Sequence, residues 1–213
     1  MTEAHAAPVP ILDAACVVVI DGKEPEYRLL LGRRHAGQIF LPGKWVFPGG
    51  RIDPEDRSRA AKIAATAAPA MQGALGPFAI AAVRELFEET GLVIGGAGNL
   101  HASQRLVPLA RAITPPGRPR RYDTWFFTIQ RSAIAAEYSD TDGELLDLGW
   151  FTIAEARRLD LPNITRLILD DVANETGLLN TAMTGRVPFY FQDSTGYQRS
   201  LIDPGCDLAC DGP

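Results

Sequence analysis

The sequence predicts an α/β sandwich. Strand-like and helical segments are interleaved along the chain, and most of the links between strands are short enough for antiparallel turns. The chain has no internal repeat, and its 213 residues suffice for one domain with a sizeable core. Short antiparallel links favour a sandwich over a doubly wound parallel sheet, because parallel strands need long crossover connections.

The predicted elements follow from local signals. Runs rich in β-branched and aromatic residues, bounded by Gly, Pro, Asn or Asp, mark the strands. Thr152, with Glu155 three residues later, predicts a capping box at the start of a short helix. We predict strands at 11–20, 27–33, 45–47, 105–113, 122–129 and 146–151, helices at 77–92, 152–159 and 165–175, a partly helical stretch at 57–74 broken at Pro69 and Gly73, and a terminal hairpin from 186–192 and 197–202. Pro48-Gly49-Gly50 is expected to end the 45–47 strand.

The composition excludes several classes of protein. A formal net charge of −5 argues against a general nucleic-acid binder, which usually carries a basic excess. No apolar run approaches the roughly 18 residues that span a bilayer. Residues 1–10, which we expect to form a flexible leader, lack the basic and apolar regions of a secretory signal. We therefore expect a cytoplasmic protein that binds neither nucleic acid nor a membrane.

The three cysteines are too few for a disulfide framework. Cys16 lies in an apolar run, which predicts a buried core thiol. Cys206 and Cys210 lie in a Gly/Pro/Asp-rich tail without a second Cys/His pair, so we expect no zinc site there. His35 and His101 have no clustering partners, and neither is assigned a ligand role.

The segment 77–92, PFAIAAVRELFEETGL, predicts an amphipathic helix with Pro77 in its first turn and Gly91 as a left-handed C-cap. Glu85, Glu88 and Glu89 gather on nearly the opposite face from the apolar residues. These carboxylates repel one another, and the helix macrodipole disfavours negative charge near a C-terminus. A bound divalent cation would reverse the sign of this arrangement. The apolar face consists of Ile80, Val83, Leu86 and Phe87.

Residues 84–92, RELFEETGL, resemble the second half of the Nudix box, whose pattern is G-x5-E-x7-R-E-U-x-E-E-x-G-U with U apolar. The sequence FPGG ending at Gly50, followed after five residues by Asp56, resembles the first half. Asp56 stands where the box has Glu, and the spacer runs from residue 57 to residue 83 instead of over seven residues.

Such an insertion is similar to that of a Nudix subgroup that includes the peroxisomal coenzyme A diphosphatase. Residues 40–50 (FLPGKWVFPGG) and 119–127 (PRRYDTWFF) also resemble this subgroup. The resemblance implies an α/β/α sandwich with a mixed central sheet over residues 11–176. It further implies an insertion at 57–76, and a C-terminal extension at 177–213 that contains the hairpin.

The resemblance also implies a hydrolase that attacks a diphosphate with water, assisted by Mg²⁺ or Mn²⁺. Glu85, Glu88 and Glu89 would hold the metal from one rigid element, because Mg²⁺ prefers hard oxygen ligands. Arg84 would pair with a box carboxylate and orient it. Gly50 would allow a close approach of the backbone, and Gly91 would end the helix.

The general base has two candidates. Glu85 is the candidate within the helix, and Glu144 is the best downstream candidate for a base or a fourth ligand. The same acidic loop holds Glu137, Asp140 and Asp142. The alternative for this loop is a solvated acidic turn.

Candidate substrate contacts come from basic and aromatic residues. Surface basic residues often bind nothing specific, and aromatic residues in strands usually belong to the core. The candidates for substrate binding are Arg33, Arg34, Arg121 and Trp45, with Arg120, Phe40, Trp125 and Phe126 as further possibilities.

Three functions compete. The leading hypothesis is a metal-dependent hydrolase that cleaves the diphosphate linkage of a nucleotide derivative, with coenzyme A or an acyl-coenzyme A as first substrate. Within this hypothesis, ADP-ribose or another nucleoside diphosphate derivative is the second candidate substrate. The second function, from another class, is a Nudix-fold ligand sensor without catalysis. The third function is the sanitation of oxidised nucleoside triphosphates. The terminal hairpin is apolar enough to form a dimer contact, so we also expect a homodimer.

Overall fold

The computed structural model describes residues 8–23, 26–64, 75–95, 102–103, 105–139, 141, 143–173 and 185–204. Within these ranges, nine strands form the central sheet and two form a small separate sheet. The strands are β1 (Ile11–Asp21), β2 (Arg28–Arg34), β3 (Trp45–Val46), β4 (Gly49–Arg51), β5 (Leu92–Ile94), β6 (Val107–Ile113), β7 (Arg121–Gln130), β8 (Ile134–Glu137), β9 (Leu145–Thr152), β10 (Val187–Asp193) and β11 (Gly196–Ile202). The helices are α1 (Pro54–Ala64), α2 (Gly76–Thr90), α4 (Ile153–Ala156) and α5 (Asn163–Ala173), with a 3₁₀ turn, η2, at Arg131–Ala133.

The central sheet is mixed, as predicted. Its order is β11-β10-β6-β7-β1-β2-β3, with β4 also paired to β1 and β9 to β2. The long strand β1 pairs in parallel with β7 from Ile11↔Arg121 to Ile20↔Gln130. Its other edge is shared between β4, which pairs with the middle of the strand, and β2, which pairs with its end. This sharing brings the Gly-Gly segment next to the centre of β1.

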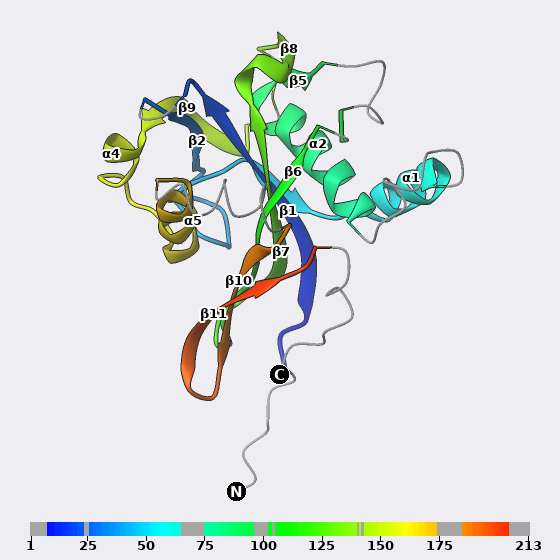
Figure 1. Ribbon diagram of the computed structural model, residues 1–213. Coiled ribbons are helices and arrows are strands. Elements are labelled where there is room, and N and C mark those ends of the chain that lie inside the picture. The colour runs from blue at the N-terminus through cyan, green and yellow to red at the C-terminus, as the bar shows by residue number, and fades with distance from the viewer. Residues whose placement is uncertain are drawn as a thin grey trace, which may run out of the picture.

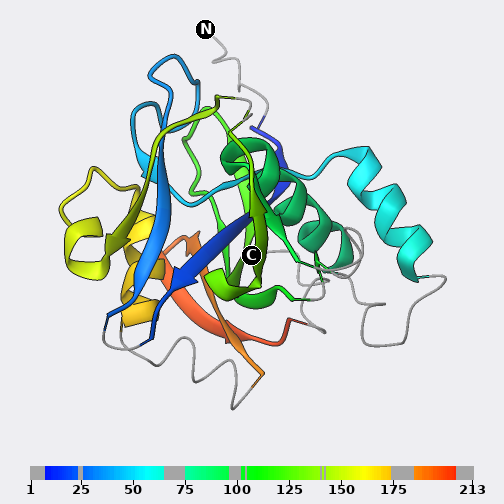
Figure 2. The ribbon, with the colours of Figure 1, turned by 90° about the horizontal axis from the view of Figure 1, so that it is seen from above.

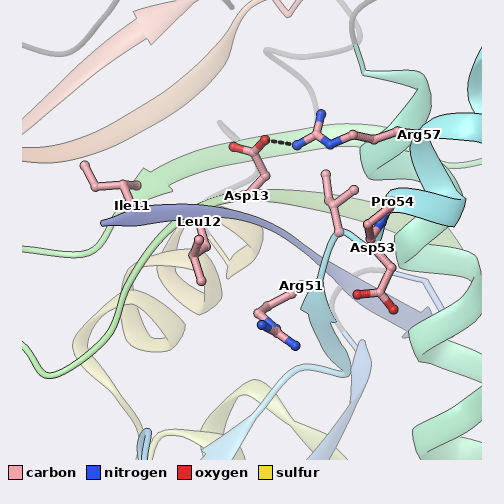
Figure 3. Close-up of a pocket in the computed structure, with 8 residues that line it drawn as sticks. Ile11, Leu12, Asp13, Arg51, Asp53, Pro54 and Arg57 are labelled. Carbon is pink, nitrogen blue, oxygen red and sulfur yellow. Dashed lines mark hydrogen bonds and ion pairs between the residues drawn. The ribbon is translucent and has the colours of Figure 1, made fainter. Parts of the chain in front are cut away.

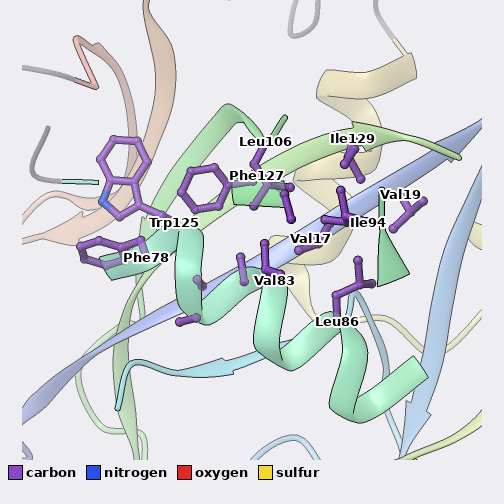
Figure 4. Close-up of a cluster of buried hydrophobic side chains, with 14 of the residues drawn as sticks. Val17, Val19, Phe78, Val83, Leu86, Ile94, Leu106, Trp125, Phe127 and Ile129 are labelled. Atoms are coloured by element: carbon purple, nitrogen blue, oxygen red, sulfur yellow. The ribbon is translucent and has the colours of Figure 1, made fainter. Parts of the chain in front are cut away.

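Helices cover both faces of the sheet (Figures 1 and 2). α1 and α2 lie on one side, and α4 and α5 lie on the other, which confirms the α/β/α arrangement. Figure 4 shows the core on the α2 side, where residues from β1, β7 and the helix meet. Alternate residues of β1 and β7 supply the second core, beneath α5. The α2-side core includes Val17, Val19, Val83, Leu86, Trp125 and Phe127, and the α5-side core includes Val18, Ile20, Phe126, Ile168 and Tyr190.

Most predicted elements are present, with shifted ends. Helix α2 and its left-handed C-cap at Gly91 (φ 71°) are confirmed, although Leu92 begins β5 instead of extending the helix. The capping box of Thr152 and Glu155 is also confirmed. Helix α1 begins at Pro54, earlier than predicted, because proline suits the first helical turn. Pro69, Gly73 and the predicted end of the 165–175 helix lie outside the described residues.

Three short strands were not predicted. Pro48-Gly49-Gly50 was expected to end the 45–47 strand, yet Gly49–Arg51 pairs with β1 as β4. β5 and β8 pair with each other in the small sheet. Strands this short carry no hydrophobic period, so their partners define them.

The terminal hairpin is part of the central sheet. β10 pairs in parallel with β6 through Phe189↔Arg111 and Tyr190↔Ala112. The Tyr190 hydroxyl donates a hydrogen bond to Asp171 of α5 at 2.5 Å. Residues 185–204 therefore contribute to the core. Within the described ranges, none of the helices is long and apolar enough to cross a membrane.

Candidate active site

Arg84 of α2 connects the two parts of the proposed Nudix box. Its guanidinium donates to both carboxylate oxygens of Asp56, at 3.2 and 2.9 Å. One nitrogen, Nη1, donates to Glu85 at 2.8 Å and to Glu88 at 2.9 Å. The other, Nη2, also donates to the backbone carbonyl of Arg51 at 2.9 Å. Asp56 is only 1% exposed, so Arg84 supplies the charge that this buried carboxylate needs.

Glu85 packs directly against Gly50. A Cβ at position 50 would overlap the Glu85 carboxylate, so any larger residue would force this side chain to move. Burial raises the pKa of Glu85 to about 7 against the lowering effect of Arg84, and the charges of Glu88 and Glu144 raise it further. A carboxyl with this pKa can exchange a proton near neutral pH.

Glu89 is held on the other side of the helix end. It is 1% exposed and accepts a hydrogen bond from the backbone N–H of Gly49 at 2.7 Å. Cys16 of β1 lies beside Glu89. The sequence predicted a buried thiol, but the residue is half-buried. Burial and the nearby charges of Glu89 and Glu85 raise the pKa of the Cys16 thiol, which keeps it protonated.

Glu144 reaches this cluster from the loop before β9. The Gln38 amide donates to the Glu144 carboxylate at 3.0 Å, and Arg34 donates to the same Gln38 side chain. Arg34 also donates to the carbonyl of Phe40 at 3.0 Å. The structure thus joins two candidates, Arg34 and Glu144, through Gln38. No motif in the sequence marked Gln38, because its role depends on how the 35–44 loop folds.

The other candidates lie apart from the carboxylates. Arg33 forms an ion pair with Asp147 on β9, and Arg121 donates to the carbonyl of Thr114 at 2.9 Å. Trp45 packs edge-on against Phe151 with ring centroids 5.1 Å apart. Trp125 and Phe126 are buried in the two cores, and Phe40 packs edge-on against Tyr122. Glu137 ends β8, and Asp140, Asp142, His101, Cys206 and Cys210 lie outside the described residues.

The carboxylates fit a hard divalent cation by donor type. No group of three or more His, Cys, Asp or Glu side chains in the described parts of the chain forms a preformed metal cluster. Glu85 and Glu88 nevertheless share Arg84 Nη1, and burial raises the pKa of Glu85 in spite of this guanidinium. Mg²⁺ usually takes only one or two carboxylates and completes its shell with water and substrate phosphates. Glu85, Glu88 and Glu89 are the residues that would hold it.

A cavity of about 440 Å³ lies beside this cluster, where β1 begins (Figure 3). Arg51 connects the two, because its carbonyl binds Arg84 while its side chain lines the cavity. Sequence reasoning did not select Arg51, and its position after Gly50 was the only available signal. The cavity is lined by Ile11, Leu12, Asp13, Arg51, Ile52, Asp53, Pro54 and Arg57.

Comparisons with known proteins support the proposed motif. Residues 77–172 match the NUDIX domain, and this range contains the 84–92 segment but not Gly50 or Asp56. Comparison with the curated proteins finds no match.

Several solved structures share the fold. A NUDIX hydrolase from Alicyclobacillus acidocaldarius has 24% sequence identity and a TM-score of 0.59, over 82% of this chain and 96% of that one. A MutT NUDIX hydrolase from Burkholderia pseudomallei has 18% identity and a TM-score of 0.50, over 76% and 97%. A NUDIX hydrolase from Nitrosomonas europaea has 15% identity and a TM-score of 0.51, over 78% and 90%. Residues 77–172, with their Arg-Glu-x-x-Glu-Glu segment, thus match the NUDIX domain, and the chain shares its fold with solved NUDIX hydrolases.

Proposed function

We propose that this chain is a Mg²⁺- or Mn²⁺-dependent hydrolase that cleaves the diphosphate linkage of a nucleotide derivative. One observation carries the proposal. Arg84 and the Gly49-Gly50 segment hold Glu85, Glu88 and Glu89 at one end of α2, where three carboxylates do not stabilise a helix by themselves. When bound there, a divalent cation would neutralise the diphosphate and lower the pKa of the attacking water.

The chain's own residues have separate roles. Glu88 and Glu89 are proposed metal ligands, and Arg84 orients Glu85 and Glu88 through one nitrogen. Glu85 can accept a proton near neutral pH, because burial raises its pKa to about 7. Glu144, held by Gln38, is the alternative base. The carboxylate that takes the proton from water returns it to solvent after the product leaves.

Coenzyme A or an acyl-coenzyme A is the proposed first substrate. The insertion between the two halves of the box supports it, together with the 40–50 and 119–127 segments that resemble the coenzyme A diphosphatase subgroup. In the fold, Asp56 and Gly50 from before the insertion contact Arg84 and Glu85 from after it. ADP-ribose is the second candidate substrate.

The test incubates purified protein with Mg²⁺ or Mn²⁺ and coenzyme A, acetyl-coenzyme A, ADP-ribose or an oxidised nucleoside triphosphate. We expect coenzyme A to be cleaved fastest, and Glu88→Gln to lower kcat at least a hundredfold. Both metals should raise the melting temperature of the wild type more than that of the Glu88→Gln variant. If no substrate is cleaved but one binds by calorimetry, the ligand-sensor hypothesis replaces the enzyme.

We also propose that the chain forms a homodimer. β11 is an edge strand of the central sheet, and its Tyr197 and Leu201 are exposed. An exposed edge with apolar side chains can pair with a second copy. A monomeric mass by light scattering would refute this proposal.

A further inference from the structure

Strand β9 carries a β-bulge opposite Gly32 of β2. The β2–β9 register shifts at this point, so that Asp147 and Leu148 of β9 oppose this one residue. Asp147 has a φ of 51°, in the left-handed region where Gly, Asn and Asp are the residues most often found. Its carboxylate accepts a hydrogen bond from Arg33 Nε at 2.7 Å across the bulge. Asp147 is thus the residue whose backbone makes the bulge possible.

The bulge changes which face of the sheet the preceding residues of β9 occupy. Trp150 packs against the α2-side core, so regular alternation would place Leu148 on that side and Leu145 on the other. Instead, the buried Leu145 shares the side of Leu148, since a Cβ added to Gly32 would meet the first at 2.8 Å and the second at 2.9 Å. The bulge therefore exchanges the two faces for the residues that precede it in β9.

This exchange determines the position of Glu144. The backbone N–H of His35 donates to the Glu144 carbonyl at 3.3 Å and extends the ladder by one residue beyond β9. Glu144 then lies on the opposite face from Leu145, where the Gln38 amide donates to its carboxylate at 3.0 Å. Without the bulge, Glu144 would occupy the side of the buried leucine and turn away from Gln38.

The position that Glu144 shares with Gln38 is within electrostatic reach of the proposed catalytic carboxylates. Besides burial, the charge of Glu144 raises the pKa of Glu85. Besides burial, the charges of Glu89 and Glu85 raise the pKa of the Cys16 thiol, which packs against the α5-side core. The carboxylates at the end of α2 therefore act beyond their own face of the sheet, and a turn of Glu144 would change its distance to them.

We propose that Asp147 is a positioning residue, whose left-handed backbone holds the bulge that places Glu144 beside Gln38 and near the carboxylates of α2. This inference rests on the proposed function and assigns Glu144 a part in catalysis. Asp147 acts through Glu144 and not by contact with the substrate. Its ion pair with Arg33 is secondary, because both side chains are about half exposed and such pairs contribute little.

The experiment compares Asp147→Val with Asp147→Gly and Asp147→Asn. Valine is β-branched and disfavours the left-handed region, whereas Gly and Asn adopt it. Val and Gly both remove the ion pair with Arg33, so the difference between these two variants reports on the backbone. Asp147→Ala is a milder replacement for use if the valine variant does not fold. The matched control is Asp160→Val, which removes an exposed ion pair with Lys44 at a position where φ is not positive.

Steady-state kinetics with coenzyme A and with ADP-ribose measure kcat and KM. We expect Asp147→Val to lower kcat about tenfold or more and to change KM less than about threefold, since a general base typically contributes about 10²- to 10⁴-fold. Asp147→Gly and Asp147→Asn should restore kcat, and Asp160→Val should behave as wild type. In a Glu144→Ala background, Asp147→Val should lower kcat no further, because both substitutions remove the same group.

A second measurement does not depend on turnover. The NMR signals of the Gln38 side-chain amide, assigned through their loss in Gln38→Ala, report on its hydrogen bond to Glu144. We expect these signals to move in Glu144→Ala and in Asp147→Val, and to stay in place in Asp147→Gly and Asp160→Val.

Unchanged kcat and unchanged Gln38 signals in Asp147→Val would overturn the inference, even if the wild type is an active hydrolase. A loss of kcat shared by the Val, Gly and Asn variants would overturn it as well, because the ion pair with Arg33 would then be the cause. Conversely, a wild type that cleaves no diphosphate, with Gln38 signals that move in Asp147→Val alone among the Asp147 variants, would refute the proposed reaction and keep the bulge as the feature that places Glu144. Circular dichroism spectra that match between variants exclude misfolding as the cause of a lower kcat.

Discussion

At the scale of single residues, Arg84 has the largest expected effect on stability. Its guanidinium is the partner of Asp56, which is almost fully buried, and of two glutamates. Replacing Arg84 by Gln leaves a buried carboxylate without its cation, a change that typically costs about 3–5 kcal/mol. We expect urea denaturation to show a loss of about 3 kcal/mol in the free energy of unfolding.

The same substitution at Arg59 supplies the comparison. Arg59 pairs with Glu55 on the exposed face of α1, and such surface pairs contribute about 0–1 kcal/mol. If Arg84→Gln were no more destabilising than Arg59→Gln, Asp56 would have to obtain its compensation elsewhere.

Glu85 should make stability depend on pH. Its pKa rises from 4.5 to about 7 on folding, mainly through burial, so the native state holds this proton more tightly than the unfolded chain. The contribution to stability is therefore complete below pH 4.5 and is lost as the pH rises through 7. The difference in unfolding free energy between wild type and Glu85→Gln, in metal-free buffer, should fall by up to about 3 kcal/mol between pH 4.5 and pH 8.

Denaturant unfolding of both proteins at a series of pH values measures this difference in free energy. Carboxylates far from Glu85 act alike in the two proteins and cancel in the difference. A free-energy difference that stays constant, or that grows with pH, would show that folding does not raise the pKa of Glu85. Added Mg²⁺ should reduce the pH dependence, since a cation favours the ionised form.

Residue identities at the site were partly readable from the sequence. The spacing of Arg84, Glu85, Glu88 and Glu89 is local to one helix, so a helical period was enough to bring them together. Arg51 and Gln38 were not readable. Arg51 is placed by the register of β4 on β1, and Gln38 by a loop that crosses to Glu144, and neither relation has a local sequence signal.

At the scale of elements, the end of α2 depends on Gly91. Its φ of 71° is left-handed, and an added Cβ would overlap the backbone carbonyl of Tyr138. Gly91→Ala therefore carries both a conformational cost of about 1–2 kcal/mol and a steric one. We expect a total loss above 2 kcal/mol in chemical denaturation, together with a shift of Glu88 and Glu89 that lowers activity.

Gly117→Ala separates these two costs. Gly117 also has a positive φ, 80°, but nothing lies within 4 Å of its added Cβ. It should lose only the conformational part, about 1–2 kcal/mol. Equal losses at both positions would mean that Tyr138 moves aside freely.

The elements that could be predicted are those with internal signals. The Gly91 cap and the Thr152 capping box each lie within a few residues of the helix that they bound. β4, β5 and β8 have three or four residues each and exist through pairing with distant segments. For this reason the Gly-Gly segment was interpreted as a stop, although it forms the strand that supports the site.

At the scale of the whole molecule, the terminal hairpin should unfold together with the rest of the central sheet. Phe189 of β10 is buried in the α2-side core, and the guanidinium of Arg111 lies 4.9 Å from its ring centroid. Phe189→Ala should cost about 3–5 kcal/mol and keep a single cooperative transition. Leu201→Ala, at an exposed position of β11, should change stability by less than about 1 kcal/mol. A separate early transition in the Phe189 variant would show that the hairpin is an independent unit.

The parallel pairing of β1 with β7 also has a consequence for how the protein is made. Contacts between these strands join residues 110 positions apart, as between Val18 and Thr128. At about 5–20 residues per second, the ribosome needs roughly 5–20 s to deliver β7 after β1 has emerged. Such non-local pairing also slows folding towards the range of milliseconds to seconds. During synthesis, the apolar run at residues 16–20 remains unpaired until β7 emerges. Helix α2 also emerges before the sheet that orders its carboxylates is complete. We therefore expect the nascent chain to gain activity late and to expose the apolar run of β1 until β7 has emerged.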